Sequence, residues 1–202
     1  MKRLSLLLLS LLVIAACNPA KDKKVNQTTI GFKTDESSKL FFKNVRRSYY
    51  DVEVMEEAKL EIYRLKKRVK ESEEPVLNLS IVNNWRYDEA YILLEPNSAA
   101  GSLSDIKVIW ENEDGKSGEI RLEGGNKKNQ LDFAAKVYEQ IQNGSQFYIM
   151  KDGVKKAFLI DSKSREAFRV TMFDYFRLTL EYWHTHSNAF PSSRHFYLSH
   201  HL

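Results

Sequence analysis

The longest apolar run of the chain lies at its very start and separates a leader from the part that folds. A short basic segment, residues 1–3, precedes residues 4–16, where only Ser5 and Ser10 interrupt the apolar side chains. This arrangement is typical of a secretory signal peptide. The run is too short for a membrane-spanning helix, which needs roughly 20 apolar residues. No second run of this length follows, so the sequence predicts an exported protein with a water-soluble body.

The leader ends in a motif that specifies how it is removed. Ile14-Ala15-Ala16-Cys17 resembles the lipobox of bacterial lipoproteins, in which an aliphatic and two small residues precede a cysteine. The resemblance covers residues 1–17. It implies cleavage between Ala16 and Cys17, a diacylglyceryl group on the Cys17 thiol and a fatty acid on the new amino terminus. Two alternatives stay open: an ordinary signal peptide cut after Ala16, and an apolar N-terminal helix with a buried thiol.

Cys17 is the only cysteine, so the chain cannot form an intramolecular disulfide. Stable membrane anchoring needs two signals, each acyl methylene contributing about 0.8 kcal/mol, and a cysteine with two or three acyl chains provides them. Asn18 stands where an Asp commonly retains Gram-negative lipoproteins in the inner membrane. The resemblance therefore implies a bacterial cell envelope location, in the outer membrane of a Gram-negative source or the plasma membrane of a Gram-positive one.

The mature chain divides into three parts by composition. Residues 17–39 are polar and lack periodicity, which predicts the lipidated cysteine followed by a flexible tether. Residues 40–183 contain the periodic segments and are predicted to form one globular domain, and residues 184–202 a His-rich tail. The formal charge is +4, of which Lys2 and Arg3 of the leader supply half. This balance, together with export, predicts no nucleic-acid partner.

Two structures compete for residues 51–74. Apolar residues recur at spacings of three and four, which predicts a helix of about five turns that ends before Pro75. The residues of this helical stripe are Met55, Ala58, Ile62, Leu65 and Val69. The apolar residues of 52–54 and 60–62 also alternate, which is typical of a β-hairpin. We favour the helix, because its stripe persists for fifteen residues.

Downstream, short strands surround a second helix. Alternating apolar residues between Gly, Asn and Pro clusters predict antiparallel strands in 77–81, 91–94, 106–110 and 120–122. We expect a helix over 129–142 that begins with Asn129 as its N-cap, and a hairpin of 147–150 and 154–160. Residues 167–183 predict a strand followed by a helical segment. The fold class is therefore α+β: a mainly antiparallel sheet with an N-terminal helix, a central helix and a C-terminal helical segment.

All five histidines lie in the last nineteen residues. His184 and His186 would project from the same face of a strand, where imidazoles can bind Zn or Cu. No Asp, Glu or Cys lies between His184 and Leu202 to complete a mixed metal site. We therefore favour a polar tail, and apart from the lipid on Cys17 we expect no cofactor.

A second cluster lies between two predicted strands and consists of Trp85, Arg86, Tyr87, Asp88 and Glu89. A loop of this composition can bind a sugar or a peptide, because the aromatic rings supply contact area and the arginine supplies hydrogen bonds. The structural alternative, which we favour, is an ion pair between Arg86 and either Asp88 or Glu89.

The chain lacks the phosphate-binding loop, dinucleotide, zinc-protease and serine-hydrolase motifs. With the predicted anchor, this favours a membrane-anchored binding or assembly module for an envelope protein, peptide or glycan over an enzyme. One alternative is an envelope hydrolase whose carboxylates, drawn from Asp88, Glu89 or Asp174, meet only in the fold. A third is metal binding through the C-terminal histidines. The sequence assigns no catalytic residue.

Overall fold

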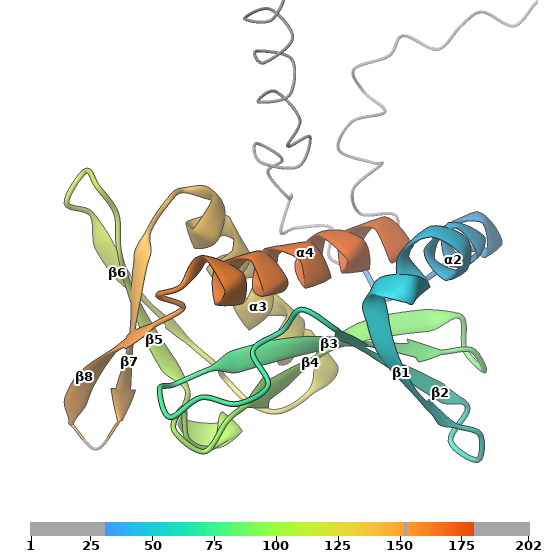
Figure 1. The fold of residues 1–202 in the computed structure, drawn as a ribbon, viewed down its shortest axis with the longest axis horizontal. Coiled ribbons are helices and arrows are strands. Elements are labelled where there is room, and N and C mark those ends of the chain that lie inside the picture. Colours follow the sequence, from blue (N-terminus) through green and yellow to red (C-terminus); the bar gives the residue numbers. More distant parts are fainter. Residues whose placement is uncertain (1–30, 152, 180–202) are drawn as a thin grey trace, which may run out of the picture.

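A computed structural model describes residues 31–151 and 153–179, and within them three α-helices and two antiparallel sheets form an α+β fold (Figure 1). The first sheet has the order β1-β2-β3-β4, and each strand is antiparallel to its neighbour in the sequence. Its strands are β1 (Tyr50–Met55), β2 (Leu60–Leu65), β3 (Leu77–Asn84) and β4 (Glu89–Pro96).

The second sheet has the order β6-β5-β7-β8 and is also antiparallel throughout. Its strands are β5 (Lys107–Glu111), β6 (Ser117–Arg121), β7 (Gln146–Lys151) and β8 (Val154–Phe158). Helix α3 (Lys127–Gln142) is inserted between β6 and β7. The predicted antiparallel sheet is thus divided into two separate sheets, with the central helix in the expected place.

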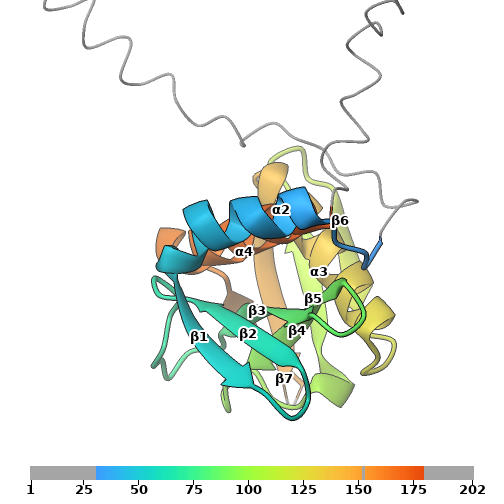
Figure 2. The same ribbon diagram turned by 90° about the vertical axis from the view of Figure 1, so that its right-hand side faces the viewer.

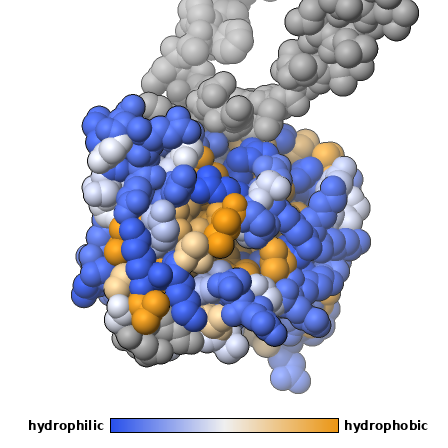
Figure 3. Space-filling model, turned by 60° about the vertical axis from the view of Figure 1, so that its left-hand side comes forward, coloured by the Kyte–Doolittle hydropathy of each residue, from blue (hydrophilic) through white to orange (hydrophobic). Residues whose placement is uncertain are grey.

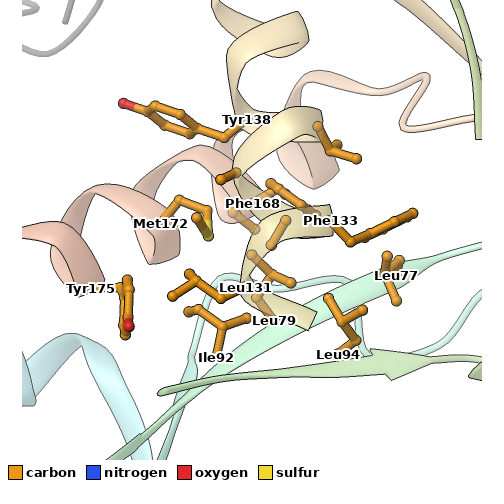
Figure 4. Packing of buried hydrophobic residues seen from close by; sticks show 14 of the residues in the cluster. Leu77, Leu79, Ile92, Leu94, Leu131, Phe133, Tyr138, Phe168, Met172 and Tyr175 are labelled. Carbon is orange, nitrogen blue, oxygen red and sulfur yellow. The ribbon is translucent and has the colours of Figure 1, made fainter. Parts of the chain in front are cut away.

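Helix α4 (Ser162–Leu178) runs along the length of the molecule, from the end of the second sheet to helix α2 (Glu36–Phe41) beside the first (Figures 1 and 2). Helix α3 packs against β4, and α4 packs against both β3 and β4. In Figure 4, apolar side chains of α3, α4 and the β3–β4 pair meet in one core, with Leu131 between the helices and the strands. Residues of the second sheet belong to the same hydrophobic core.

The prediction of a helix over residues 51–74 is wrong, and the competing hairpin is present. Strands β1 and β2 pair with Val52 opposite Tyr63, and Lys59 adopts a positive φ of 59° in the turn between them. The helical stripe counted Met55 and Ala58 as core positions, but both are exposed. The segment forms strands instead of a helix because the period-2 pattern directs Tyr50, Tyr63 and Leu65 into the core.

The predicted strand at the start of residues 167–183 is also wrong. Residues 162–178 form one continuous helix that begins after the N-cap Asp161. Phe168, Met172 and Phe176 recur every four residues and are fully buried, which is the helical spacing. In a short segment rich in aromatic residues, alternating apolar positions do not distinguish a strand from a helix. The helix forms because this segment packs against α3 and β3.

The N-terminal helix of the fold is α2, which lies before the predicted position. Asp35 is its N-cap, with the carboxylate accepting a hydrogen bond from the Ser38 amide at 2.9 Å. Helix α2 continues through the π-helical turn η2 (Phe42–Arg46) and the 3-10 turn η3 (Arg47–Tyr49) directly into β1. Its first residue, Glu36, precedes residue 40, the expected start of the domain. Helix α3 is capped by Asn126 instead of Asn129.

Candidate functional site around helix α2

A buried ion pair positions the segment α2–η3 on the domain. The Arg46 guanidinium in η2 binds both carboxylate oxygens of Asp174 in α4, with Nε 2.8 Å from Oδ1 and Nη2 2.8 Å from Oδ2. The Tyr50 hydroxyl donates a third hydrogen bond to Asp174, at 2.7 Å. Phe42 packs its ring 4.9 Å from that of Tyr63. The segment is therefore held to both α4 and the first sheet.

A pocket of about 290 Å³ lies between this segment and strands β2 and β3. Its apolar wall includes Leu178, at the end of α4. It is lined by Glu36, Lys39, Leu40, Phe42, Lys43, Glu61, Tyr63, Asn83 and Leu178.

The polar part of this pocket is a hydrogen-bonded group centred on Glu61. The Tyr63 hydroxyl donates to the Glu61 carboxylate, and Asn83 Nδ2 lies 3.4 Å from it. Arg47 Nη2 is 3.8 Å from the other carboxylate oxygen. Burial and the hydrogen bond to Glu61 raise the pKa of Tyr63 above its usual value, so this hydroxyl stays protonated and remains a donor at neutral pH.

Lys39 connects the pocket to the turn between β3 and β4. Its ammonium lies 2.8 Å from Asp88 Oδ1 in that turn and also pairs with Glu36 in its own helix. The hydrogen bonds that Lys39 donates to Asp88 and Glu36 raise its pKa, so it is fully charged at neutral pH. The same lysine fixes the position of the turn relative to α2.

The predicted loop cluster forms this turn. Arg86 lies over the ring of Tyr87, with its guanidinium carbon 5.5 Å from the ring centre. The acids pair with lysines of other segments instead of Arg86: Asp88 with Lys39, and Glu89 with Lys127 at 2.7 Å. The hydrogen bond from Lys127 lowers the pKa of Glu89. Trp85 is half-buried, and the acids serve to attach the turn to α2 and α3.

Three exposed apolar side chains lie on the segment that forms one wall of the pocket, and one of them, Leu40, lines it. Leu40 is 60% exposed, Val45 47% and Tyr49 50%, and all three belong to the ten residues of α2, η2 and η3 that follow Lys39. The Arg46 guanidinium stacks on the Tyr49 ring at 4.6 Å. We call these three side chains, together with the pocket, the α2 surface. It combines apolar area with a small polar cavity.

The carboxylates named for a hydrolase are all engaged in ion pairs. Asp88, Glu89 and Asp174 each pair with a different cation, Lys39, Lys127 and Arg46 respectively. A glycoside hydrolase of the usual kind would need two carboxyl groups converging on one substrate. Among the described residues, no group of three His, Cys, Asp or Glu side chains could hold a metal ion.

Cys17, Ala16, His184 and His186 lie outside the described residues. In the part that the structure describes, no helix has the length and apolarity to cross a membrane.

Sequence reasoning missed Glu61, Tyr63 and Asn83, because it placed 61 and 63 on a helix. The signal that identifies the first two is their period-2 spacing: on a strand they share one face.

Comparisons of this chain with known protein families, with curated proteins and with solved structures found no match.

Proposed function

We propose that this protein is a bacterial envelope lipoprotein, anchored through Cys17, whose domain docks another envelope protein on the α2 surface. The observation that carries the proposal is that Leu40, Val45 and Tyr49, all exposed, lie on the one short segment that also forms a wall of the pocket. Single exposed apolar residues are ordinary on a protein surface, whereas three within ten residues, next to a pocket with charged walls, favour an interaction site.

The place where the tether enters supports this choice of surface. The Tyr175 hydroxyl in α4 donates a hydrogen bond to the carbonyl of Gly31, at 2.8 Å. The start of the described chain is therefore held beside the C-terminal half of α4, and α2 packs against that helix (Figure 2). A chain anchored at Cys17 reaches the domain through residues 18–30, so the α2 surface lies on the side of the domain that the tether joins.

The chemistry of this surface fits a protein better than a glycan. Leu40 and Val45 are aliphatic, and the ring of Tyr49 already has the Arg46 guanidinium over one face. Apolar and aromatic side chains next to a cavity are typical of protein interfaces. The flanking charges are mixed in sign: Lys39 and Lys43 stand beside Glu36 and Glu61. Mixed charges fix the register of a protein partner and do not favour a polyanion.

Site-specific photo-crosslinking in intact cells tests the proposal. A photoreactive amino acid replaces Leu40, Val45 or Tyr49 in the full-length chain, and Val154, equally exposed on β8, serves as the matched control. We expect one adduct of the same mass from the three α2 positions and none from position 154. A Val45→Asp substitution should abolish the adduct formed from position 40. Equal labelling from position 154, or no adduct from α2, contradicts the proposal.

A further inference from the structure

A second pocket lies at the opposite end of α4, where β7 and β8 meet the start of the helix. Its volume is about 500 Å³, within the range of small-ligand sites. Figure 3 turns this end of the molecule toward the viewer and shows apolar side chains in a hollow framed by hydrophilic ones. The pocket is lined by Gly144, Gln146, Phe147, Tyr148, Ala157, Phe158, Leu159, Ile160, Ser162 and Arg165.

Arg165 is fixed in the wall of this pocket by uncharged groups. Its Nε donates to the Leu159 carbonyl at 2.8 Å, and its Nη2 donates to the Ser145 carbonyl. The guanidinium carbon lies 5.3 Å from the centre of the Phe147 ring. Burial lowers the pKa of Arg165, but a guanidinium remains charged at neutral pH. A positive charge is thus held rigidly in a half-buried position.

Among the described residues, no acid compensates this charge. The two nearest acids in the sequence have other partners: Asp161 accepts from the Ser164 amide at 2.7 Å, and Glu166 pairs with Arg169 at 2.7 Å. Within residues 31–151 and 153–179, Arg165 forms no ion pair with a carboxylate. Buried charges are normally paired, because desolvating an isolated ion is costly. Arg165 is half-buried and donates its hydrogen bonds to carbonyl groups, so an anionic ligand in the pocket would supply a counter-charge.

The backbone beside Arg165 is strained. Leu159 has a φ of 49°, in the left-handed region that residues with a branched side chain rarely adopt. Its carbonyl is the acceptor for Arg165 Nε, so the strained residue helps to position the guanidinium. Strained residues of this kind cluster at ligand sites, where the surrounding structure maintains them.

The remaining polar groups of the pocket also favour an acceptor ligand. Gln146 Oε1 accepts a hydrogen bond from the Tyr148 hydroxyl at 3.2 Å, and the N–H groups of the same amide can serve a ligand as donors. The apolar lining comes from Phe147, Ala157 and Ile160. Hydrogen-bond donors beside apolar walls suit a ligand that has a hydrogen-bond-accepting group and an apolar substituent.

We propose that this pocket binds a carboxylate attached to an apolar body, with Arg165 pairing the carboxylate and Ile160 contacting the apolar part. A carboxylate fits better than a phosphate, because one guanidinium balances its single charge and the planar groups can form two parallel hydrogen bonds. Such a carboxylate can come from a small organic acid or from the C-terminus of a peptide that ends in an apolar residue.

Binding is measured by calorimetry on the full-length protein in detergent micelles. The probes are 3-phenylpropanoate and an acetylated tetrapeptide ending in Phe, each compared with its amide. We expect at least one acid to bind and its amide to bind at least about tenfold more weakly, since the amide loses the charge-assisted hydrogen bonds. Saturable binding of the small acid would identify a small-molecule ligand, and binding of the peptide alone would identify a peptide C-terminus. Absence of binding by both acids, or equal binding of acid and amide, overturns the proposal.

Two variants locate the site. Arg165→Gln should lose at least about tenfold in affinity, but Arg165 also supports Leu159 and Ser145, and its loss can affect folding. Ile160→Glu avoids this problem, because Ile160 is 65% exposed and lines the pocket. It introduces a competing carboxylate beside Arg165 and should weaken acid binding by a similar factor. Val154→Glu adds the same charge at a site that is 55% exposed and outside the pocket. Equal affinities of Ile160→Glu and Val154→Glu would overturn the proposal.

Discussion

Arg46 and Asp174 lie 128 residues apart in the sequence and form a bidentate ion pair, in which the Asp174 side chain is only 1% exposed. The pair joins η2 to α4, and Tyr50 at the start of β1 donates to the same carboxylate. Burial, and then the negative charge of Asp174, raises the pKa of Tyr50 well above its usual value. The hydroxyl therefore remains a donor at neutral pH, and the α2 surface depends on this three-residue junction for its position.

Asp174→Asn should lower the free energy of unfolding by about 3 kcal/mol, because it leaves the Arg46 guanidinium half-buried without its counter-charge. Urea denaturation followed by circular dichroism measures the change. The double variant Arg46→Met/Asp174→Leu should be closer in stability to the original protein, since it removes both charges together. A loss below about 0.5 kcal/mol for Asp174→Asn would show that the junction contributes little.

Gly118→Ala should destabilise the second sheet. A Cβ at position 118 would lie 2.7 Å from Cζ2 of Trp110 on the paired strand β5, closer than the ring can accept without moving. Overpacking of this kind costs about 1–3 kcal/mol. Gly125→Ala is the matched control, because its Cβ would have no neighbour within 4 Å. Thermal unfolding measures both variants, and equal melting temperatures would contradict the predicted close contact.

Asp35 should make the stability of the domain depend on acid pH. The hydrogen bond from the Ser38 amide lowers the pKa of Asp35 below 3.8 in the folded state. A lowered folded-state pKa contributes stability that is present above the unfolded-state value and is lost as the pH falls through the folded-state value. Asp35→Ala should therefore cost about 1 kcal/mol at pH 7, the usual value for an N-cap.

The loss from Asp35→Ala should shrink as the pH falls below about 4, near the pKa of an unfolded Asp. Denaturant titrations at several pH values measure it. Asp35→Asn, which keeps the capping oxygen, should lose less at pH 7 and show a weaker pH dependence. A constant difference between the original protein and Asp35→Ala from pH 7 to pH 3 would contradict the assigned cap.

Local patterns predict much of this fold but not its junctions. Alternating apolar residues located β3 and β4, and the spacing of Phe133 and Val137 located α3, because one face of each element is buried. The hairpin β1–β2 was misassigned because Met55 and Ala58 happen to fall on a helical stripe. What decides the structure there is the packing of Tyr50 and Tyr63 against Phe42, and such contacts between segments leave no local periodicity.

The two pockets cannot be predicted from the sequence for a related reason. Arg165 looks like an ordinary helix residue in the sequence. The pocket around it forms only where β7, β8 and α4 meet in the fold. Asp88 and Glu89 were recognised as a charged cluster, but their partners Lys39 and Lys127 belong to distant segments. Charge partners separated by many residues cannot be chosen from the sequence, because every exposed lysine is an equivalent candidate.

We propose that acyl chains on Cys17 hold this domain at a membrane, and the most direct test is the intact mass of the protein purified from its native membranes. We predict a chain that begins at Cys17 and carries the added mass of a diacylglyceryl group, with or without a further fatty acid. The Cys17→Ser variant should lack this mass and should no longer sediment with the membrane fraction. An unmodified Cys17, together with membrane sedimentation that survives Cys17→Ser, would contradict the claim.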